Sequence, residues 1–234
     1  MVLCLSENGG NMLGIICAMQ VEMDAVLKKA DSYKENIIRE QVFYQGKMNN
    51  VDFVVTVSSP GKVCAALSTA FMVMHYDLDY LINVGIAGGL SSKLHTLDTV
   101  VCDKIDQWDF DTAELGDLRG FDKNIRTCYA DNYLNALIKK ALPDALIGPI
   151  VTGDTFVEKD ETKKVILDIY PDVLACEMEG GAVAFTAKKF HVPFTIIRTI
   201  SDMGDGVSYT KLEQEACNVA PECMDKVTKE LALQ

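Results

Sequence analysis

Short apolar runs rich in β-branched residues alternate with helical patterns along this chain, from residue 12 to its end. Strands of this kind are predicted at residues 12–18, 42–48, 51–58, 80–84, 97–102, 145–152 and 194–200. Helices are predicted at residues 20–29, 63–76, 133–142, 160–169, 180–190 and 211–233, the last interrupted near Pro221. Because such strands and helices assemble into layers, this order predicts an α/β fold with one sheet covered on both faces.

The size of the chain sets its domain organisation. A length of 234 residues with 49% hydrophobic and 24% charged composition is typical of one large globular α/β domain. No Gly/Ser-rich linker, internal repeat or low-complexity tract divides the sequence. We therefore predict a single domain at residues 12–234, preceded by residues 1–11 as an N-terminal extension for which disorder is one possibility.

Charge and cysteine content exclude several classes of partner. The formal net charge of −12 would repel a phosphate backbone, so nucleic acid is not an expected partner. The eight cysteines include no C-x-x-C pair and lie mostly in apolar runs, which predicts reduced thiols in a cytoplasmic protein. The three histidines lack metal-ligand spacing, so no metal cofactor is implied. The sequence has neither the pattern of a signal peptide nor an apolar run long enough to span a membrane, so membrane association is not expected.

Acidic residues bracket one helix and one strand between residues 175 and 205. Glu177 and Glu179 stand at the start of the helix predicted at 180–190, and Asp202 follows the strand predicted at 194–200. Ligands of open α/β sheets bind outside the carboxyl ends of strands, so Glu179 and Asp202 can face one cavity. Acids in a first helical turn and Asp after a strand also have ordinary structural roles, and spacing alone leaves both interpretations open.

Two glycine motifs suggest loops near a ligand without identifying it. Ser59-Pro60-Gly61-Lys62 is not a phosphate-binding loop, because that motif needs Gly where Thr56 stands and Ser or Thr where Val63 stands. Residues 85–89, Gly-Ile-Ala-Gly-Gly, follow a predicted strand without the dinucleotide-binding spacing. They are expected to turn away from that strand, either as a plain turn or so that a ligand can approach the backbone.

Four motifs carry a resemblance to a known family. CEMEGGAVA, VPFTIIRTISD, GIICAMQVEMD and VTGDTFV resemble the motif set of the 5'-methylthioadenosine/S-adenosylhomocysteine nucleosidases, within the purine and uridine phosphorylase superfamily. The resemblance extends from residue 12 to about residue 230. It implies a nucleoside phosphorylase-like three-layer α/β/α fold with a central mixed twisted sheet. It also implies hydrolysis of the N-glycosidic bond of methylthioadenosine and adenosylhomocysteine, and of 5'-deoxyadenosine as a further candidate, with release of adenine and a 5-thioribose sugar.

The resemblance assigns the catalytic roles residue by residue. Asp202, beside Ser201, matches the acid that protonates purine N7, and one carboxyl group that donates to N7 and accepts from the N6 amine suits a 6-aminopurine. Glu22 matches the base for the attacking water, although a plain helix-start acid is its alternative interpretation. Glu179 matches the residue on the ribose hydroxyls, with Met178 beneath the ribose ring.

The resemblance also implies the remaining contacts. The other positions expected to bind substrate are Met19, Ala87, Gly88, Phe156 (stacked on adenine), Val157 (backbone to the N1/N6 edge), Glu177 and Arg198. For Arg198, a buried ion pair with Glu177 or Glu179 is an equally good interpretation. Thr112 and Leu115 match positions that close the 5' pocket of the neighbouring subunit, which implies a homodimer.

The sequence leaves three alternative functions to the hydrolysis of methylthioadenosine and adenosylhomocysteine. Phosphorolysis is disfavoured because the chain has four arginines and the loop carrying Glu22 has no cation before Lys28. Aminofutalosine hydrolysis is a related variant, and a non-catalytic nucleoside-binding protein would be expected to lack one of the three acids. Two departures from the family pattern, Ile86 near the water and Pro60 near the 5' group, affect the water's hydrogen bonding and the choice of 5' substituent.

Overall fold

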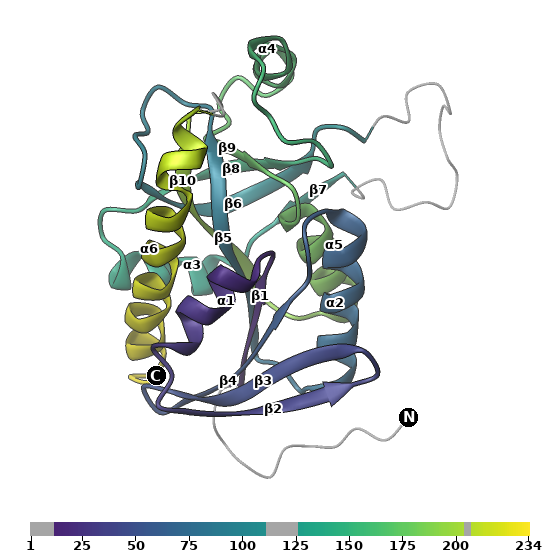
Figure 1. The fold of residues 1–234 in the computed structure, drawn as a ribbon, viewed down its shortest axis with the longest axis vertical. Coiled ribbons are helices and arrows are strands. Elements are labelled where there is room, and N and C mark those ends of the chain that lie inside the picture. Colours follow the sequence, from purple (N-terminus) through teal and green to yellow (C-terminus); the bar gives the residue numbers. More distant parts are fainter. Residues whose placement is uncertain (1–11, 111–125, 204–206) are drawn as a thin grey trace.

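A computed structural model describes residues 12–110, 126–203 and 207–234, and in these ranges the chain folds around a ten-stranded mixed sheet (Figure 1). The strands are β1 (Met12–Cys17), β2 (Ser32–Ile38), β3 (Gln41–Met48), β4 (Val51–Val57), β5 (Tyr80–Gly89), β6 (Thr99–Gln107), β7 (Thr127–Tyr129), β8 (Leu146–Thr152), β9 (Ala175–Glu177) and β10 (Phe194–Asp202). The helices are α1 (Gln20–Leu27), α2 (Lys62–His75), α3 (Asn132–Ala141), α4 (Asp160–Ile169), α5 (Gly180–Phe190) and α6 (Val207–Leu231).

The central strands of the sheet close into a ring. The strand order is β10-β6-β8-β9-β5-β1-β4-β3-β2, and β10 also pairs in parallel with β5. Strands β1, β4, β5 and β10 are parallel through the pairs β1–β4, β1–β5 and β10–β5, so their carboxyl ends meet at one end of the sheet. The segments that follow or end these four strands therefore lie close together.

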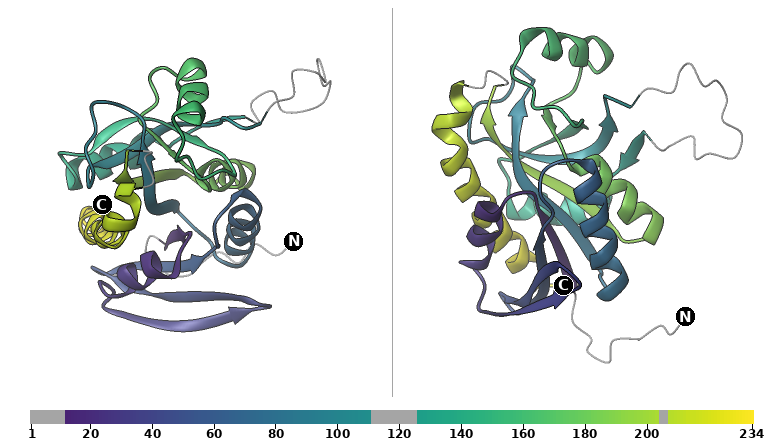
Figure 2. Two further views of the ribbon diagram at one scale, coloured as in Figure 1. Left: turned by 45° about the horizontal axis from the view of Figure 1, so that its top comes forward. Right: turned by 45° about the vertical axis from the view of Figure 1, so that its right-hand side comes forward.

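Helices cover both faces of the sheet. Helices α1, α3 and α6 pack on one side and α2 and α5 on the other (Figures 1 and 2). Each side has its own apolar core. One core joins Met23 and Val26 of α1 to Met224 of α6, and the other joins Met72 of α2 to Val183 of α5. The predicted sheet between two helical layers is confirmed.

Local sequence explains several element ends. Asn49 and Asn50 both have positive φ, 50° and 66°, as a two-residue turn between β3 and β4 requires, which confirms the predicted hairpin. The Asp131 side chain accepts a hydrogen bond of 2.8 Å from the backbone N–H of Leu134 and so caps α3. His191 ends α5 in the left-handed conformation.

Three sequence predictions differ from the structure for identifiable reasons. Strand β5 does not turn at Gly85 but continues to Gly89, because β10 pairs with it as far as Gly88 and β9 pairs with Gly88 and Gly89. Helix α6 is not interrupted near Pro221, because packing against β10, α1 and α3 outweighs the local cost of proline. Strand β2 was not predicted because this exposed edge strand lacks an apolar alternation.

Candidate active site

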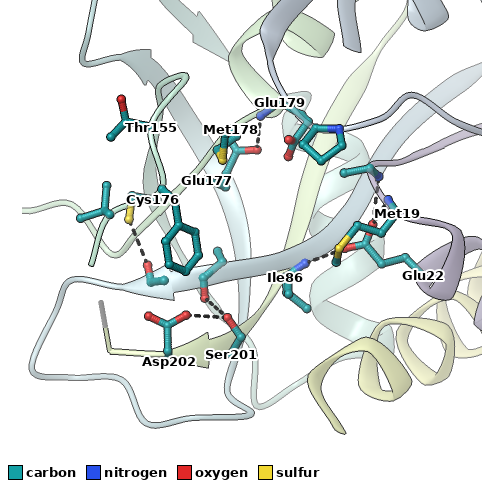
Figure 3. A pocket seen from close by; sticks show the side chains of 16 residues that line it. Met19, Glu22, Ile86, Thr155, Cys176, Glu177, Met178, Glu179, Ser201 and Asp202 are labelled. Atoms are coloured by element: carbon teal, nitrogen blue, oxygen red, sulfur yellow. Dashed lines mark hydrogen bonds between the residues drawn. The ribbon is translucent and has the colours of Figure 1, made fainter. Parts of the chain in front are cut away.

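One pocket lies at the carboxyl ends of the parallel strands and gathers most of the predicted site residues (Figure 3). It is lined by Ala18, Met19, Glu22, Pro60, Ile86, Ala87, Gly88, Thr155, Phe156, Val157, Cys176, Glu177, Met178, Glu179, Ser201 and Asp202. In Figure 3, Asp202 and Ser201 lie at one end of the pocket, Met19 and Glu22 lie at the other, and Glu179 is on the wall between them. The sheet thus brings together three acids that are far apart in the sequence.

Glu22 is buried and held by backbone N–H groups. Its Oε2 accepts hydrogen bonds of 2.9 Å from both Ala18 and Met19, and its Oε1 accepts one of 3.1 Å from Ile86. Burial raises the pKa of Glu22, while these N–H groups and the positive charge of Arg198 oppose that rise. Glu22 therefore serves the start of α1, as a helix-start acid does, and also lines the pocket.

Glu179 stands at the start of α5 with fewer donors than Glu22. The Gly61 N–H donates a hydrogen bond of 2.9 Å to Oε1 of Glu179, and Arg198 Nη2 lies 3.7 Å from its Oε2. Burial, and then the negative charge of Glu177, raise the pKa of Glu179 to about 7. Near neutral pH this carboxyl group is therefore poised between its two protonation states.

Glu177 is fully engaged inside the protein. Its Oε2 accepts hydrogen bonds from the backbone of Glu179 (2.9 Å) and Gly180 (2.7 Å) and pairs with Arg198, and its Oε1 accepts from the hydroxyl of Thr152. These contacts hold the turn between β9 and α5 in place. Although Glu177 lines the pocket, its oxygens are already committed to this turn.

Arg198 lies behind the pocket and is not among its lining residues. Its side chain is 1% exposed, pairs with Glu177 and donates a hydrogen bond of 2.6 Å to Asn83 Oδ1. The expectation that Arg198 contacts the substrate directly therefore does not match its position, and the alternative of a buried ion pair does. Its partner Glu177, the last residue of β9, lines the pocket in its place.

Asp202 ends β10 at the other end of the pocket. It is 2% exposed, and its Oδ2 accepts a hydrogen bond of 2.7 Å from the Ser201 hydroxyl. The neighbouring thiol of Cys176 donates to the carbonyl of Gly88 at 3.6 Å, and burial raises the pKa of that thiol to about 12. This end of the pocket therefore has a carboxyl group next to an un-ionised thiol. Such a pair can bind the polar edge of an uncharged ligand.

Three of the lining residues are not among the positions predicted from the sequence. Ala18, Thr155 and Cys176 line the pocket, and each lies inside or beside a motif already singled out. Their position next to the motif acids was the available signal. Thr112 and Leu115 lie outside the residues that the structure describes.

Two further properties concern the described residues only. In residues 12–110, 126–203 and 207–234, no group of three His, Cys, Asp or Glu side chains is placed to bind a metal ion. No helix in the same ranges is both long enough and apolar enough to cross a bilayer.

The class to which this protein belongs follows from its similarity to known proteins. The model of the phosphorylase superfamily matches residues 12–232. A 5'-methylthioadenosine/S-adenosylhomocysteine nucleosidase of Hydrogenovibrio crunogenus is 35% identical over 209 residues, which cover 86% of this chain and 90% of that protein. This chain belongs to the phosphorylase superfamily and, within it, to the family of 5'-methylthioadenosine/S-adenosylhomocysteine nucleosidases.

Solved structures agree with this assignment. The S. pneumoniae 5'-methylthioadenosine/S-adenosylhomocysteine nucleosidase, solved with a transition-state inhibitor, superposes with a TM-score of 0.88 at 28% identity, covering 95% of this chain and all of that chain. A futalosine hydrolase of Helicobacter pylori superposes with a TM-score of 0.87 at 28% identity, covering 94% and 98%. The predicted nucleoside phosphorylase-like fold is confirmed.

Proposed function

We propose that this chain hydrolyses the N-glycosidic bond of 5'-methylthioadenosine and S-adenosylhomocysteine, releasing adenine and a 5-thioribose sugar, with 5'-deoxyadenosine as a further candidate substrate. The observation that carries the proposal is that Glu22, Glu179 and Asp202 line one pocket from three separate elements. The names of the relatives support the choice of substrates.

The proposed mechanism divides the work between the two ends of the pocket. Asp202 acts as the general acid that donates a proton to purine N7, so that adenine leaves as a neutral molecule. Glu22 accepts the proton of a water that attacks the sugar C1', and its raised pKa makes it a better base. Glu179 as a carboxylate accepts hydrogen bonds from the ribose hydroxyls and stabilises the cationic sugar of the transition state.

Phe156 and Met178 complete the proposed substrate contacts. Phe156 is 46% exposed and lines the pocket beside Val157, and we propose that its aromatic ring stacks on the planar base. Met178 lies next to Glu179 and offers a soft, apolar surface for the ribose ring. Met19 and Pro60 also line the pocket, and we propose that they contact the 5' substituent.

The charge of the pocket favours water over phosphate as the nucleophile. Of the described residues that line it, none is Lys, Arg or His, whereas four are acids. A phosphate nucleophile would need cationic donors near Glu22, and the nearby cation Arg198 is paired with Glu177. Hydrolysis is therefore favoured over nucleoside phosphorolysis.

Futalosine hydrolysis is the second candidate function. It is favoured by the similarity to the H. pylori futalosine hydrolase, whose TM-score of 0.87 is close to the value of 0.88 for the S. pneumoniae nucleosidase. Both reactions would use the same acids, so the 5' side of the pocket near Met19 and Pro60 would decide between them.

Release of adenine in phosphate-free buffer tests the proposal. We expect adenine to appear when the purified protein is incubated with methylthioadenosine, and the rate to be unchanged when phosphate is added. Adenine that appears only with phosphate would indicate a phosphorylase. Turnover of aminofutalosine but not of methylthioadenosine would indicate the second candidate.

We extend the proposal to the assembly and cellular role. We propose that residues 12–234 act as one domain and form a homodimer in which Thr112 and Leu115 of one subunit close the 5' side of the other's pocket. An apolar stripe on α2 supports this, because Val63, Leu67 and Met74 are 79%, 56% and 58% exposed. We also propose a cytoplasmic location and a role in methionine salvage.

A further inference from the structure

Two consecutive backbone N–H groups at the start of α2 each hold a carboxylate from elsewhere in the chain. Gly61 donates to Glu179 Oε1 at 2.9 Å, and Lys62 donates to Asp154 Oδ1 at 2.8 Å. Gly61 has φ of 98°, a conformation that favours glycine, and the positive end of the helix dipole attracts both acids. The direction of the Gly61 N–H thus depends on how the first turn of α2 is held.

The side chain of Lys62 links three segments around this turn. Its Nζ lies 2.6 Å from Asp109 Oδ1 and 3.9 Å from Asp154 Oδ2. The backbone N–H of Asp154 donates to the other oxygen of Asp109 at 2.9 Å. Lys62, Asp109 and Asp154, which we name the Lys62 clasp, follow β4, β6 and β8 respectively.

The clasp connects two segments that line the pocket. On one side it continues through Gly61 to Glu179, the acid assigned to the ribose. On the other side Asp154 leads directly into Thr155–Val157, which line the pocket and include Phe156, the residue assigned to the base. A displacement of the α2 turn would therefore change the contacts to both the ribose and the base of a bound nucleoside.

We propose that Lys62, Asp109 and Asp154 are positioning residues. They hold the Gly61 N–H against Glu179 and fix the position of the ribose wall of the pocket relative to the base wall. The roles of ribose and base in this proposal rest on the proposed function, whereas the effect on Glu179 does not.

The surroundings of Glu179 make the clasp measurable. Burial and the charges of Glu177 on β9 and Glu22 on α1 favour its protonated form, and Arg198 on β10 and the Gly61 N–H favour the carboxylate. Loss of the N–H removes one of the two stabilising groups. The pKa of Glu179 then rises above its value of about 7.

Carboxyl-group NMR titration of the ligand-free protein tests this directly, with the signal assigned through Glu179→Gln. In Asp154→Ala, which cannot accept from the Lys62 N–H, we expect the Glu179 midpoint to rise by about one pH unit, equivalent to about tenfold in the proton equilibrium. Asp154→Asn keeps an acceptor oxygen and should stay near wild type. Asp160→Ala, on an almost fully exposed side chain of α4, is the matched control.

Each outcome decides one question. A midpoint that is the same in Asp154→Ala and wild type overturns the clasp, as does an equal shift in the Asp160→Ala control. If Asp154→Ala does not fold, Lys62→Met, which loses only the contacts of Nζ, must show a smaller shift in the same direction. Absence of adenine release by the wild type would instead contradict the proposed function and leave the titration result valid.

Activity provides a second readout of the clasp. In Asp154→Ala the acid limb of kcat/KM against pH should move upward together with the NMR midpoint, and KM at high pH should exceed that of wild type because the base wall is looser. An acid limb that stays in place while the NMR midpoint moves would show that the clasp holds Glu179 without affecting the reaction.

Discussion

Glu22 and Glu179 are both buried carboxylates of one pocket, yet backbone N–H groups hold them unequally. Glu22 accepts from Ala18, Met19 and Ile86, whereas Glu179 accepts from Gly61. Hydrogen bonds to the charged form of an acid stabilise it, so differences in donors separate the behaviour of acids in one site. The division of labour between acids thus depends on backbone geometry as well as on side-chain identity.

Replacement of Asp202 by Asn tests the acid at the base end. The amide has nearly the same shape and can still accept from the Ser201 hydroxyl, so the fold should be retained. Because the amide has no acidic proton for N7, kcat for adenine release should fall by about 10²–10⁴-fold. Asp168→Asn, on the surface of α4, is the control and should leave kcat unchanged. Full turnover in Asp202→Asn would remove Asp202 from this role.

Replacement of Glu179 by Gln tests the raised pKa of Glu179 through stability. The Glu179 carboxyl group binds its proton more tightly in the folded state than in the unfolded state. Its contribution to the free energy of unfolding is therefore fully present below pH 4.5 and is lost as the pH rises through about 7. The variant has no such pH-dependent loss. As the pH rises from 4.5 to 7, its free energy of unfolding should therefore increase relative to that of wild type, by up to about 3 kcal/mol. Urea unfolding at several pH values measures the difference. Parallel pH profiles for the two proteins would contradict the shift.

At the scale of elements, one glycine allows the edge strands to pair. A Cβ on Gly46 of β3 would lie 1.9 Å from the carbonyl oxygen of Ser32 and 2.7 Å from the Cα of Tyr33, both in β2. Gly46→Ala should therefore push β2 away and lower the free energy of unfolding by about 1–3 kcal/mol. Since β2 lies at the far edge of the sheet, kcat of the folded variant should not change. Gln45→Ala, one residue earlier in β3, is the control, and an equally stable Gly46→Ala would refute the clash.

Elements with a local signal could be predicted from the sequence. The Asn49-Asn50 turn needs only two residues that tolerate positive φ, and the spacing of apolar residues predicts α5. Helix α6 shows the limit of such signals, because its continuation past Pro221 depends on packing against distant elements. The three-residue strand β9 is likewise set by its partners β5 and β8.

At the scale of the whole molecule, assembly of the site follows from the closed ring of strands. The spacing of Glu179 and Asp202 predicted that they could share a cavity, but only the register of β10 against β5 aligns Asp202 with Gly88. The ion-pair partner of Arg198 could not be predicted either. Its side chain is long enough to reach either an acid or the substrate, and only the tertiary fold shows that it pairs with Glu177 at the end of β9.

The exposed stripe on α2 provides a test of the proposed homodimer. Leu67 is 56% exposed in the middle of the stripe, so Leu67→Asp places a charge where a second subunit would bury an apolar surface. Sedimentation should show a monomer, and KM for methylthioadenosine should rise because the partner no longer closes the 5' side.

Val165→Asp on α4 is the matched control for Leu67→Asp, since Val165 is also an exposed apolar residue, at 51%, but on a different helix. It should remain a dimer with wild-type KM, because α4 is not part of the stripe. A Leu67→Asp variant that sediments as wild type would exclude α2 as the contact. A monomeric variant with wild-type KM would instead show that the pocket is complete within one subunit, so that Thr112 and Leu115 of a partner are not needed to bind the 5' group.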